Sequence, residues 1–214
     1  MTDASDESRN YWDQFYQTDR LGIEDIPSQF AAFVVSEFPK SQTIIDIGCG
    51  NGRDSFFFCR HVNEVVGLDG SRIAIEHCKL KSDRLNLRNV QFHQVNLSTD
   101  ACLGFIQGLK LDLSGTVAYA RFLLHAIDEK SEANLLKMAR HVTEHGGAIA
   151  LEFRTHRDEN QKKETSKHYR RYINPLEFME CARSAGLNLA YFTEGFGFAK
   201  YKSDDAHVAR FIFN

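Results

Sequence analysis

Short apolar runs alternate along the chain with longer segments in which apolar residues recur every three or four positions. The short runs, rich in β-branched residues, predict strands at 43–47, 65–68, 90–95, 116–120 and 148–153. The longer segments predict helices at 54–60, 71–85, 132–145 and 175–185. Because this alternation is typical of parallel strands connected by helices, we expect an α/β domain with helices on both faces of one sheet.

Both ends of the chain add elements to this unit. Two more strands are predicted at 187–193 and 208–213, where a glycine-containing segment joins them into an antiparallel hairpin at one sheet edge. Near the amino end, aromatic residues spaced three and four apart predict two short helices, with Ser28 as the cap of the second. We expect them to form a helical cap over 11–40 of a single domain spanning 1–214.

The composition is that of an ordinary globular protein, with 43% hydrophobic residues and a formal net charge of −3. This charge disfavours a protein that binds mainly nucleic-acid phosphates. The five cysteines show no C-x-x-C spacing, which favours reduced thiols over disulfides, and no spacing indicates a metal site. The first ten residues resemble no signal peptide, and the longest apolar stretch, 30–35, is too short to cross a bilayer. We expect a cytoplasmic protein without membrane insertion.

A glycine-rich loop directly follows the first predicted strand. Gly48, Gly50 and Gly52 occupy alternate positions between that strand and the next helix. Glycine permits a tight turn and lets a ligand approach the backbone, and the amino end of a helix favours electron-rich ligand groups. Asp69 ends the second strand, where a carboxylate can bind the two hydroxyls of a ribose. The loop therefore predicts a ligand that contains a nucleoside.

Asp46, two positions before the first glycine, separates two kinds of nucleotide ligand. The G-x-G-x-G spacing differs from the dinucleotide fingerprint G-x-G-x-x-G, which leaves room for a pyrophosphate. A carboxylate here would repel a pyrophosphate and attract a sulfonium or ammonium group. The pattern thus favours a cationic ligand and disfavours a nicotinamide-dependent dehydrogenase.

These motifs resemble those of class I S-adenosylmethionine-dependent methyltransferases. The resemblance extends over about half the chain, through 44–52, 66–69, 92–97, 119–125 and 145–147. It implies a Rossmann-like, mostly parallel sheet of seven strands in the order 3-2-1-4-5-7-6 with strand seven antiparallel. It also implies S-adenosylmethionine as cofactor and S-adenosylhomocysteine as product. In the first motif the chain is similar to small-molecule members such as thiopurine and tellurite-resistance methyltransferases.

The resemblance also implies a set of cofactor-binding residues. It places the methionine part of the cofactor near Asp46 and the three glycines, the ribose at Asp69, and the adenine between Asn96 and Leu97. The family usually has Asp where this chain has Asn96, and an Asn side chain can hydrogen-bond the adenine amine. The other cofactor contacts that it implies are Gly70, Ser71, Tyr11 and Trp12. For the two aromatic residues, packing in the core is the alternative.

Methyl transfer from a sulfonium is an in-line displacement with a neutral leaving group, so alignment and exclusion of water supply most of the catalysis. A general base is needed only when the acceptor arrives protonated, as an alcohol does. His125, after the fourth strand, is the first candidate base, and Glu152, near the end of the fifth, is the second. The alternatives are a packing or capping role for His125 and a salt bridge from Glu152 to Arg154.

A basic segment follows the fifth strand and predicts a substrate lid over 154–175. Between 154 and 171 it has seven Lys or Arg residues against three acidic ones. Arginine pairs bind carboxylates and phosphates, and tyrosines stack on flat rings or sugars, so we expect an anionic or carbohydrate small-molecule acceptor. A solvated basic loop is the alternative. The candidate substrate-binding residues are Arg121, Arg154, His168, Tyr169, Arg170 and Arg171.

The favoured reaction is O-methylation of a small molecule, and other functions stay open. A non-catalytic regulatory module that binds S-adenosylmethionine would keep the glycine loop and Asp69 without needing His125. A nucleic-acid methyltransferase is disfavoured by the acidic balance and by the lack of both an N/D-P-P-Y/F motif and a Pro-Cys pair. The acceptor atom and the oligomeric state cannot be read from the sequence.

Overall fold

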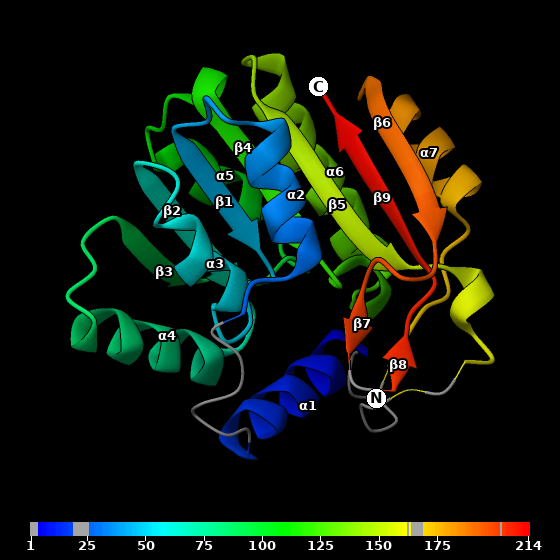
Figure 1. Cartoon of the computed structure of the whole chain (residues 1–214), viewed down its shortest axis with the longest axis horizontal. Coiled ribbons are helices and arrows are strands. Elements are labelled where there is room, and N and C mark those ends of the chain that lie inside the picture. Colours follow the sequence, from blue (N-terminus) through cyan, green and yellow to red (C-terminus); the bar gives the residue numbers. More distant parts are fainter. Residues whose placement is uncertain (1–3, 19–25, 162, 164–168, 202) are drawn as a thin grey trace.

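Seven strands form one sheet in the order β3-β2-β1-β4-β5-β9-β6 (Figure 1). The computed structural model describes residues 4–18, 26–161, 163, 169–201 and 203–214. Strands β1 to β5 pair in parallel, and β9 is antiparallel to both of its neighbours, which confirms the expected order and the antiparallel seventh strand. The strands are β1 Thr43–Ile47, β2 Glu64–Asp69, β3 Val90–Gln94, β4 Thr116–Arg121, β5 Ala148–Arg154, β6 Leu189–Gly195 and β9 Val208–Phe213.

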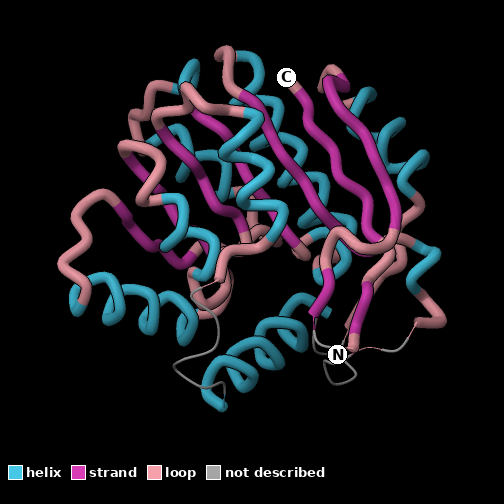
Figure 2. The backbone as a smooth tube through the Cα atoms, viewed as in Figure 1, coloured by secondary structure: helices cyan, strands magenta, loops and turns pink. Residues whose placement is uncertain are grey.

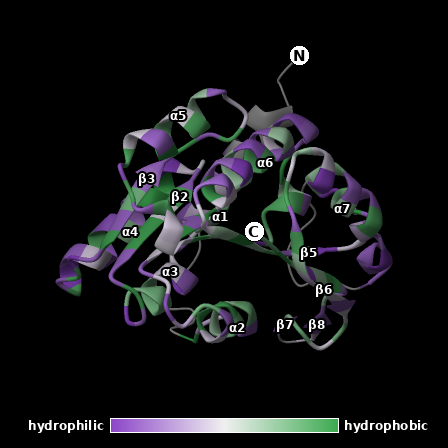
Figure 3. Cartoon of the chain, turned by 90° about the horizontal axis from the view of Figure 1, so that it is seen from above, coloured by the Kyte–Doolittle hydropathy of each residue, from purple (hydrophilic) through white to green (hydrophobic). Residues whose placement is uncertain are grey.

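Helices cover both faces of this sheet, as the view in Figure 3 shows. One face packs against α5, α6 and α7, and the other packs against α2, α3 and α4. The helices are α1 Ala4–Thr18, α2 Gln29–Glu37, α3 Arg53–Phe58, α4 Arg72–Arg84, α5 Ala101–Gly108, α6 Glu129–Glu144 and α7 Pro175–Ser184. Because both faces are covered, the central strands are apolar throughout, which is the pattern that the sequence shows.

Strand β1 shows how the sequence sets the two cores. All of its residues are buried, and successive side chains point to opposite faces of the sheet. Ile44 belongs to the core under α2, α3 and α4, whereas Ile45 and Ile47 belong to the core under α5, α6 and α7. Asp46 interrupts this apolar pattern, and its buried carboxylate marks the place where the strand meets the functional site.

Side-chain caps fix the starts of several helices. The predicted cap is confirmed at α2, where the Ser28 hydroxyl accepts a hydrogen bond of 2.9 Å from the Ala31 N–H. The Asp128 carboxylate likewise caps α6 through the Ser131 N–H, at 2.8 Å. Asn174 caps α7, whose first residue is a proline. Each cap satisfies an N–H group that has no partner within its helix.

Two elements were not predicted from the sequence. Helix α5 contains two glycines, which weaken the helical pattern, and it forms where Cys102 and Ile106 pack into the core. A small hairpin of β7 Lys200–Tyr201 and β8 Asp204–Asp205 follows β6 and precedes β9 along the chain, and it lies beyond the end of the large sheet (Figure 2). Its strands are too short to show a period of two, so their pairing comes from tertiary structure.

The start of the segment expected as a lid is a fixed part of the fold. The buried Arg154 guanidinium binds the carboxylates of Asp158 and Asp204, each at 2.6 Å. Asp158 also accepts a hydrogen bond from the His207 N–H at 3.0 Å. Arg154 thus joins the end of β5 to β8, and its expected role as a substrate-binding residue stays a prediction. Residues 162 and 164–168 lie outside the described part of the chain.

We expect Arg154→Ala to lower the free energy of unfolding by about 3–5 kcal/mol, because it leaves two carboxylates in a buried cluster without their main counter-charge. Arg157→Ala is the matched control, since Arg157 pairs with Glu194 at the surface and its side chain is 55% exposed. This control should lose no more than about 1 kcal/mol. Urea unfolding of the two variants measures the difference, and equal losses would contradict a structural role for Arg154.

Candidate active site

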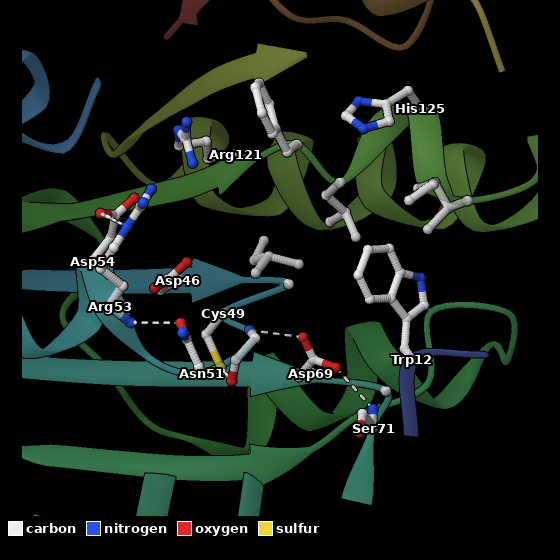
Figure 4. A pocket seen from close by; sticks show the side chains of 18 of the residues that line it. Trp12, Asp46, Cys49, Asn51, Arg53, Asp54, Asp69, Ser71, Arg121 and His125 are labelled. Carbon is white, nitrogen blue, oxygen red and sulfur yellow. Dashed lines mark hydrogen bonds and ion pairs between the residues drawn. The ribbon is translucent and has the colours of Figure 1, made fainter. Parts of the chain in front are cut away.

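A cavity of about 880 Å³ lies at the carboxyl ends of β1, β2 and β4. Ligands of open α/β sheets bind at this edge. The walls come from segments far apart in the sequence: the glycine loop, the end of β2, the turn after β4, helix α1 and residues 198–201. Figure 1 shows α1 lying across the ends toward which these strands point, and Figure 4 shows the cavity from close by.

The glycine loop has a backbone conformation that side chains disfavour. Gly48, Gly50 and Gly52 have φ angles of +76°, +55° and +75°. At Gly50 a Cβ atom would also lie 2.4 Å from the Tyr16 hydroxyl. Gly48 and Gly50 line the cavity, whereas Gly52 begins α3 and packs against Phe56. The structure therefore gives Gly52 a role in the turn rather than direct contact with a ligand.

The Asp46 carboxylate is buried at the end of β1 and lines the cavity (Figure 4). Burial raises its pKa from 3.8 to about 7, against a hydrogen bond of 2.5 Å from the Ser55 hydroxyl that favours the charged form. The charges of Asp54 and Asp69 add to the rise. A cation beside such a desolvated carboxylate would favour its ionised form. This part of the cavity therefore suits a positively charged ligand rather than a pyrophosphate.

Asp69 is oriented by the backbone on both sides of it. Its Oδ2 accepts a hydrogen bond from the Gly50 N–H at 2.9 Å, and its Oδ1 accepts one from the Ser71 N–H at 2.8 Å. Burial raises the pKa of Asp69, and these N–H groups oppose the rise. Each oxygen keeps a lone pair for a ligand hydroxyl. The neighbouring Gly70 leaves space, because a Cβ there would meet no atom closer than 4.0 Å.

Asn96 and Leu97 line the cavity together, in the place expected for an adenine. The Asn96 amide oxygen accepts hydrogen bonds from the Ser98 N–H at 3.0 Å and from the Ser98 hydroxyl at 2.9 Å, which occupies both of its lone pairs. Among the described residues, none accepts a hydrogen bond from the Asn96 amide nitrogen. This corrects the expected pairing with an adenine amine: Asn96 offers N–H groups, which suit a ring nitrogen.

Helix α1 covers the cavity, and both Trp12 and Tyr16 line it. The Asp13 carboxylate attaches the helix to the start of α4, where it accepts a hydrogen bond from the Ser71 hydroxyl. Tyr11 is not among the lining residues, and its ring contacts the Trp12 ring edge-on at 5.1 Å. The structure thus favours Trp12 over Tyr11 as a ligand contact. Asp13 was missed because no local pattern distinguishes it from the other acidic residues of the helix.

The turn after β4 contains a strained residue that the sequence does not reveal. Phe122 has a φ of +56°, which is rare for a bulky side chain, and it lines the cavity. The guanidinium carbons of Arg121 and Arg154 lie 4.2 Å and 5.2 Å from the centre of its ring. Strained backbone of this kind persists where surrounding contacts impose it, and it often marks functional sites.

His125 is buried beside this turn and lines the cavity. Its Nδ1 accepts a hydrogen bond from the Arg154 N–H at 3.4 Å. A neutral imidazole whose Nδ1 is an acceptor carries its proton on Nε2. In this tautomer Nε2 is a donor, whereas a general base would need Nε2 to be unprotonated. The geometry therefore points to a donor and leaves the expected base role as a prediction.

Glu152 was wrongly predicted as a second candidate base. It does not line the cavity, and both of its carboxylate oxygens are occupied. Oε1 accepts a hydrogen bond from Arg121 Nε at 2.8 Å, and Oε2 accepts one from Arg210 Nε at 2.7 Å. Both oxygens are thus held by guanidinium groups of the protein, and neither faces the cavity.

The basic segment contributes to the cavity only in part. Tyr169 and Arg170 line it, and His168 lies outside the described residues. Arg171 lies away from the cavity, where it pairs with the Glu132 carboxylate and donates to the Leu124 carbonyl at 3.3 Å. The expected role of Arg171 in substrate binding is therefore corrected to a link between this segment and α6.

A protein-family model described as "Methyltransferase domain" matches residues 39–189. The chain belongs to this methyltransferase family. The matched range includes the glycine loop, Asp69, Asn96 and the turn after β4. The predictions of a methyltransferase and of its Rossmann-like fold are confirmed.

The similar solved structures support the fold and do not identify the substrate. An S-adenosylmethionine-dependent methyltransferase from Anabaena variabilis superposes with a TM-score of 0.75 and 19% identity over 100% of this chain and 96% of that one. A TehB-like methyltransferase from Corynebacterium glutamicum gives a TM-score of 0.62 and 16% identity over 97% of both chains. At these identities the likeness is one of fold.

A curated relative is the 23S rRNA (uracil(1939)-C(5))-methyltransferase RlmD of Aliivibrio fischeri, which is 30% identical over 87 residues. The alignment covers 41% of this chain and 19% of that protein, so the chain spans about a fifth of the length of this relative. The likeness therefore concerns a shared part of the methyltransferase domain.

The cavity of this methyltransferase fits S-adenosylmethionine, whose use as cofactor is confirmed at the level of the family. The buried Asp46 carboxylate suits its positive charge, and Asp69 has lone pairs for its ribose hydroxyls. Asn96 offers N–H groups on the adenine side. In the described part of the chain, no group of three His, Cys, Asp or Glu side chains could hold a metal ion. None of the described helices is long and apolar enough to cross a membrane.

In the ligand-free protein, ionisation of Asp46 should lower the free energy of unfolding as the pH rises. Between pH 4 and pH 7 the folded protein holds a proton on Asp46 that the unfolded chain has released, so the free energy of unfolding falls with increasing pH. Asp46→Asn removes this dependence and can still accept from the Ser55 hydroxyl. We expect its stability advantage over the wild type to grow by about 2–3 kcal/mol from pH 5 to pH 8.

Denaturant unfolding of both proteins at the two pH values measures this change. The control is Asp83→Asn, which alters an exposed carboxylate on α4 and should show the same difference from the wild type at both pH values. A difference for Asp46→Asn that does not change with pH would contradict a protonated, desolvated Asp46.

Proposed function

We propose that this methyltransferase transfers the methyl group of S-adenosylmethionine to a small-molecule acceptor enclosed in the cavity, with oxygen as the favoured acceptor atom. The observation that carries the proposal is that α1 and residues 198–201 line the cavity together with the glycine loop. A covered cavity of about 880 Å³ has a size typical of sites for small ligands. Excluding water from the reacting groups favours methyl transfer.

The charges around the cavity support a small acceptor over RNA. Its lining residues include five aspartates against four arginines and one lysine, so the wall is balanced rather than basic. A groove for RNA needs a surplus of positive charge along the path of the phosphates. The rRNA methyltransferases that resemble part of this chain keep RNA as the competing acceptor class.

All five cysteines are free thiols, which supports a reducing, cytoplasmic setting.

Within this proposal the protein binds and orients the two ligands. Asp46 and Asp69 would hold the charged and ribose parts of the cofactor, and Asn96 would contact its adenine. Bound S-adenosylmethionine supplies an electrophilic methyl group on a positively charged sulfur. On the acceptor side, the imidazole of His125 lines the cavity and would contact the acceptor, either as a hydrogen-bond donor or as a general base.

Binding and turnover measurements test the proposal. Trp12 is the single tryptophan and lines the cavity, so its fluorescence should change when S-adenosylmethionine or S-adenosylhomocysteine binds, and NADH should give no saturable change. We expect Asp69→Ala to weaken S-adenosylmethionine binding about 10- to 100-fold, because two hydroxyl contacts to a carboxylate are lost. The control Asp83→Asn, on the outer part of α4, should bind as the wild type does.

The acceptor class is found by measuring release of S-adenosylhomocysteine with panels of nucleotide-linked sugars, small carboxylic acids, phenols and structured RNA. Turnover with one of the small molecules and none with RNA is the expected result. Turnover confined to RNA would overturn the small-molecule proposal. Tight cofactor binding with no turnover in any panel would favour a non-catalytic binding module.

Two substitutions at His125 separate a donor from a general base. Glutamine retains an N–H donor but cannot take a proton near neutral pH, and alanine retains neither property. If His125 is a donor, His125→Gln should keep kcat within about 10-fold of the wild type, and His125→Ala should lose more than that. If it is a base, both variants should lose about 100-fold or more, and the wild-type rate should fall at acidic pH. Cofactor affinity should stay within about 2-fold in either case.

A further inference from the structure

Arg121 ends β4 and reaches the cavity in a fixed orientation (Figure 4). Its Nε donates to Glu152 Oε1 at 2.8 Å, and the second oxygen of Glu152 accepts a hydrogen bond from Arg210 Nε at 2.7 Å. Glu152 is fully buried, so its carboxylate cannot turn toward solvent. The chain Arg210–Glu152–Arg121 therefore holds the Arg121 guanidinium by one edge.

The other edge of this guanidinium has no acceptor. Among the described residues, none takes a hydrogen bond from Nη1 or Nη2 of Arg121, although its side chain is only 18% exposed. One face of the group lies over the Phe122 ring at 4.2 Å, which removes water from that side. A desolvated guanidinium with unused N–H groups binds a partner with two oxygens more strongly than an exposed one does.

The carboxylates nearest to Arg121 are already engaged by other groups of the protein. Glu152 is shared between Arg121 and Arg210. Asp54 accepts hydrogen bonds from the Ser28 N–H, the Ser28 hydroxyl and the Tyr119 hydroxyl. An anion placed against Arg121 would therefore supply acceptors to Nη1 and Nη2 that these carboxylates do not supply.

The position of Arg121 relative to the glycine loop suits the acceptor rather than the cofactor. The turn that follows Arg121 packs on the loop, since a Cβ at Gly48 would lie 2.9 Å from the Leu123 side chain. In Figure 4, Arg121 and His125 lie on the opposite side of the glycine loop from Asp69. An anion held there would be part of a molecule that approaches the cofactor from the acceptor side.

We propose that Arg121 is the anion anchor of the acceptor site, so that the methyl acceptor carries a carboxylate or phosphate group bound by Nη1 and Nη2. The proposal rests on the proposed function and gives its acceptor a chemical class. It assigns recognition of the anion to the end of β4 rather than to the basic segment after β5. Within that segment, Arg154, Arg157 and Arg171 are each paired with a carboxylate of the protein itself.

Three probes that share a phenyl ring test whether Arg121 binds an anion. Benzoate, phenyl phosphate and benzamide share a phenyl ring, which can rest on Phe122. They differ in the group on that ring, which is a carboxylate, a phosphate or a neutral amide. In calorimetric titrations, the wild type should bind benzoate or phenyl phosphate at least 10-fold more tightly than benzamide. The better of the two anions identifies the group that the site prefers. Equal binding of all three, or no binding of either anion, would overturn the proposal.

Variants then assign the preference to Arg121. Arg121→Gln should reduce the preference for the anion to less than 2-fold, and Arg121→Lys should keep part of it. Arg183→Gln on α7 is the matched control, because this exposed arginine lies outside the cavity lining and should leave the preference unchanged. A preference that survives in Arg121→Gln would overturn the assignment.

A second variant guards against loss of folding. Arg121→Gln leaves the buried Glu152 paired with Arg210 at 2.7 Å, and Arg121→Met keeps the same ion pair while filling the space with an apolar side chain. Arg121→Met should fold, bind S-adenosylhomocysteine within about 3-fold of the wild type, and show no preference for the anions. Each titration is run with and without S-adenosylhomocysteine. Failure of the wild type to bind that molecule would count against the proposed function, whereas the probe preference decides on Arg121 in both conditions.

Discussion

The hydrogen bond of 2.9 Å from the Gly50 N–H to the Asp69 carboxylate connects the glycine loop to the end of β2. It forms because β1 and β2 are parallel neighbours that end together, with Ile47 opposite Leu68, and because Gly50 adopts a φ of +55°. In the same place the Tyr16 hydroxyl packs closely on Gly50, since a Cβ there would lie 2.4 Å from it. The floor of the cavity and the helix that covers it therefore depend on one backbone arrangement, and a side chain at Gly50 would disturb both.

The cavity separates charge between its two sides. Asp46 and Asp69 lie on the side of the loop, where burial raises the pKa of both carboxyls, and Arg121 lies on the other with unused N–H groups. In a poorly solvated site, polar groups that lack a hydrogen-bond or ionic partner are costly. A cationic cofactor and an anionic acceptor would each supply the missing charge and would attract one another across the site. Such a pairing aligns the reactants without requiring a strong base.

Sequence patterns predicted the sheet, the glycine loop and the acidic strand ends, because these depend on local periodicity and on spacing along one βαβ unit. They did not predict the strain at Phe122 or the contact of Asp13 with Ser71, which arise from packing between distant segments. Glu152 was misassigned for a related reason. Its neighbour Arg154 suggested a partner along the chain, whereas its partners Arg121 and Arg210 come from the adjacent strands β4 and β9.

Two buried arginines, Arg154 at the end of β5 and Arg210 in β9, affect the acceptor side indirectly. Arg154 binds Asp204 of β8, and Arg210 donates to the Phe198 carbonyl at 3.0 Å, so both cations position the segment that forms one wall of the cavity. Arg154 also lies over Phe122 and donates its N–H to His125. One buried cation thus links the wall, the strained turn and the imidazole. These contacts come from β5, β8 and β9, whereas α1 contacts the start of α4 and the glycine loop through Asp13 and Tyr16, so different elements build the two sides of the cavity.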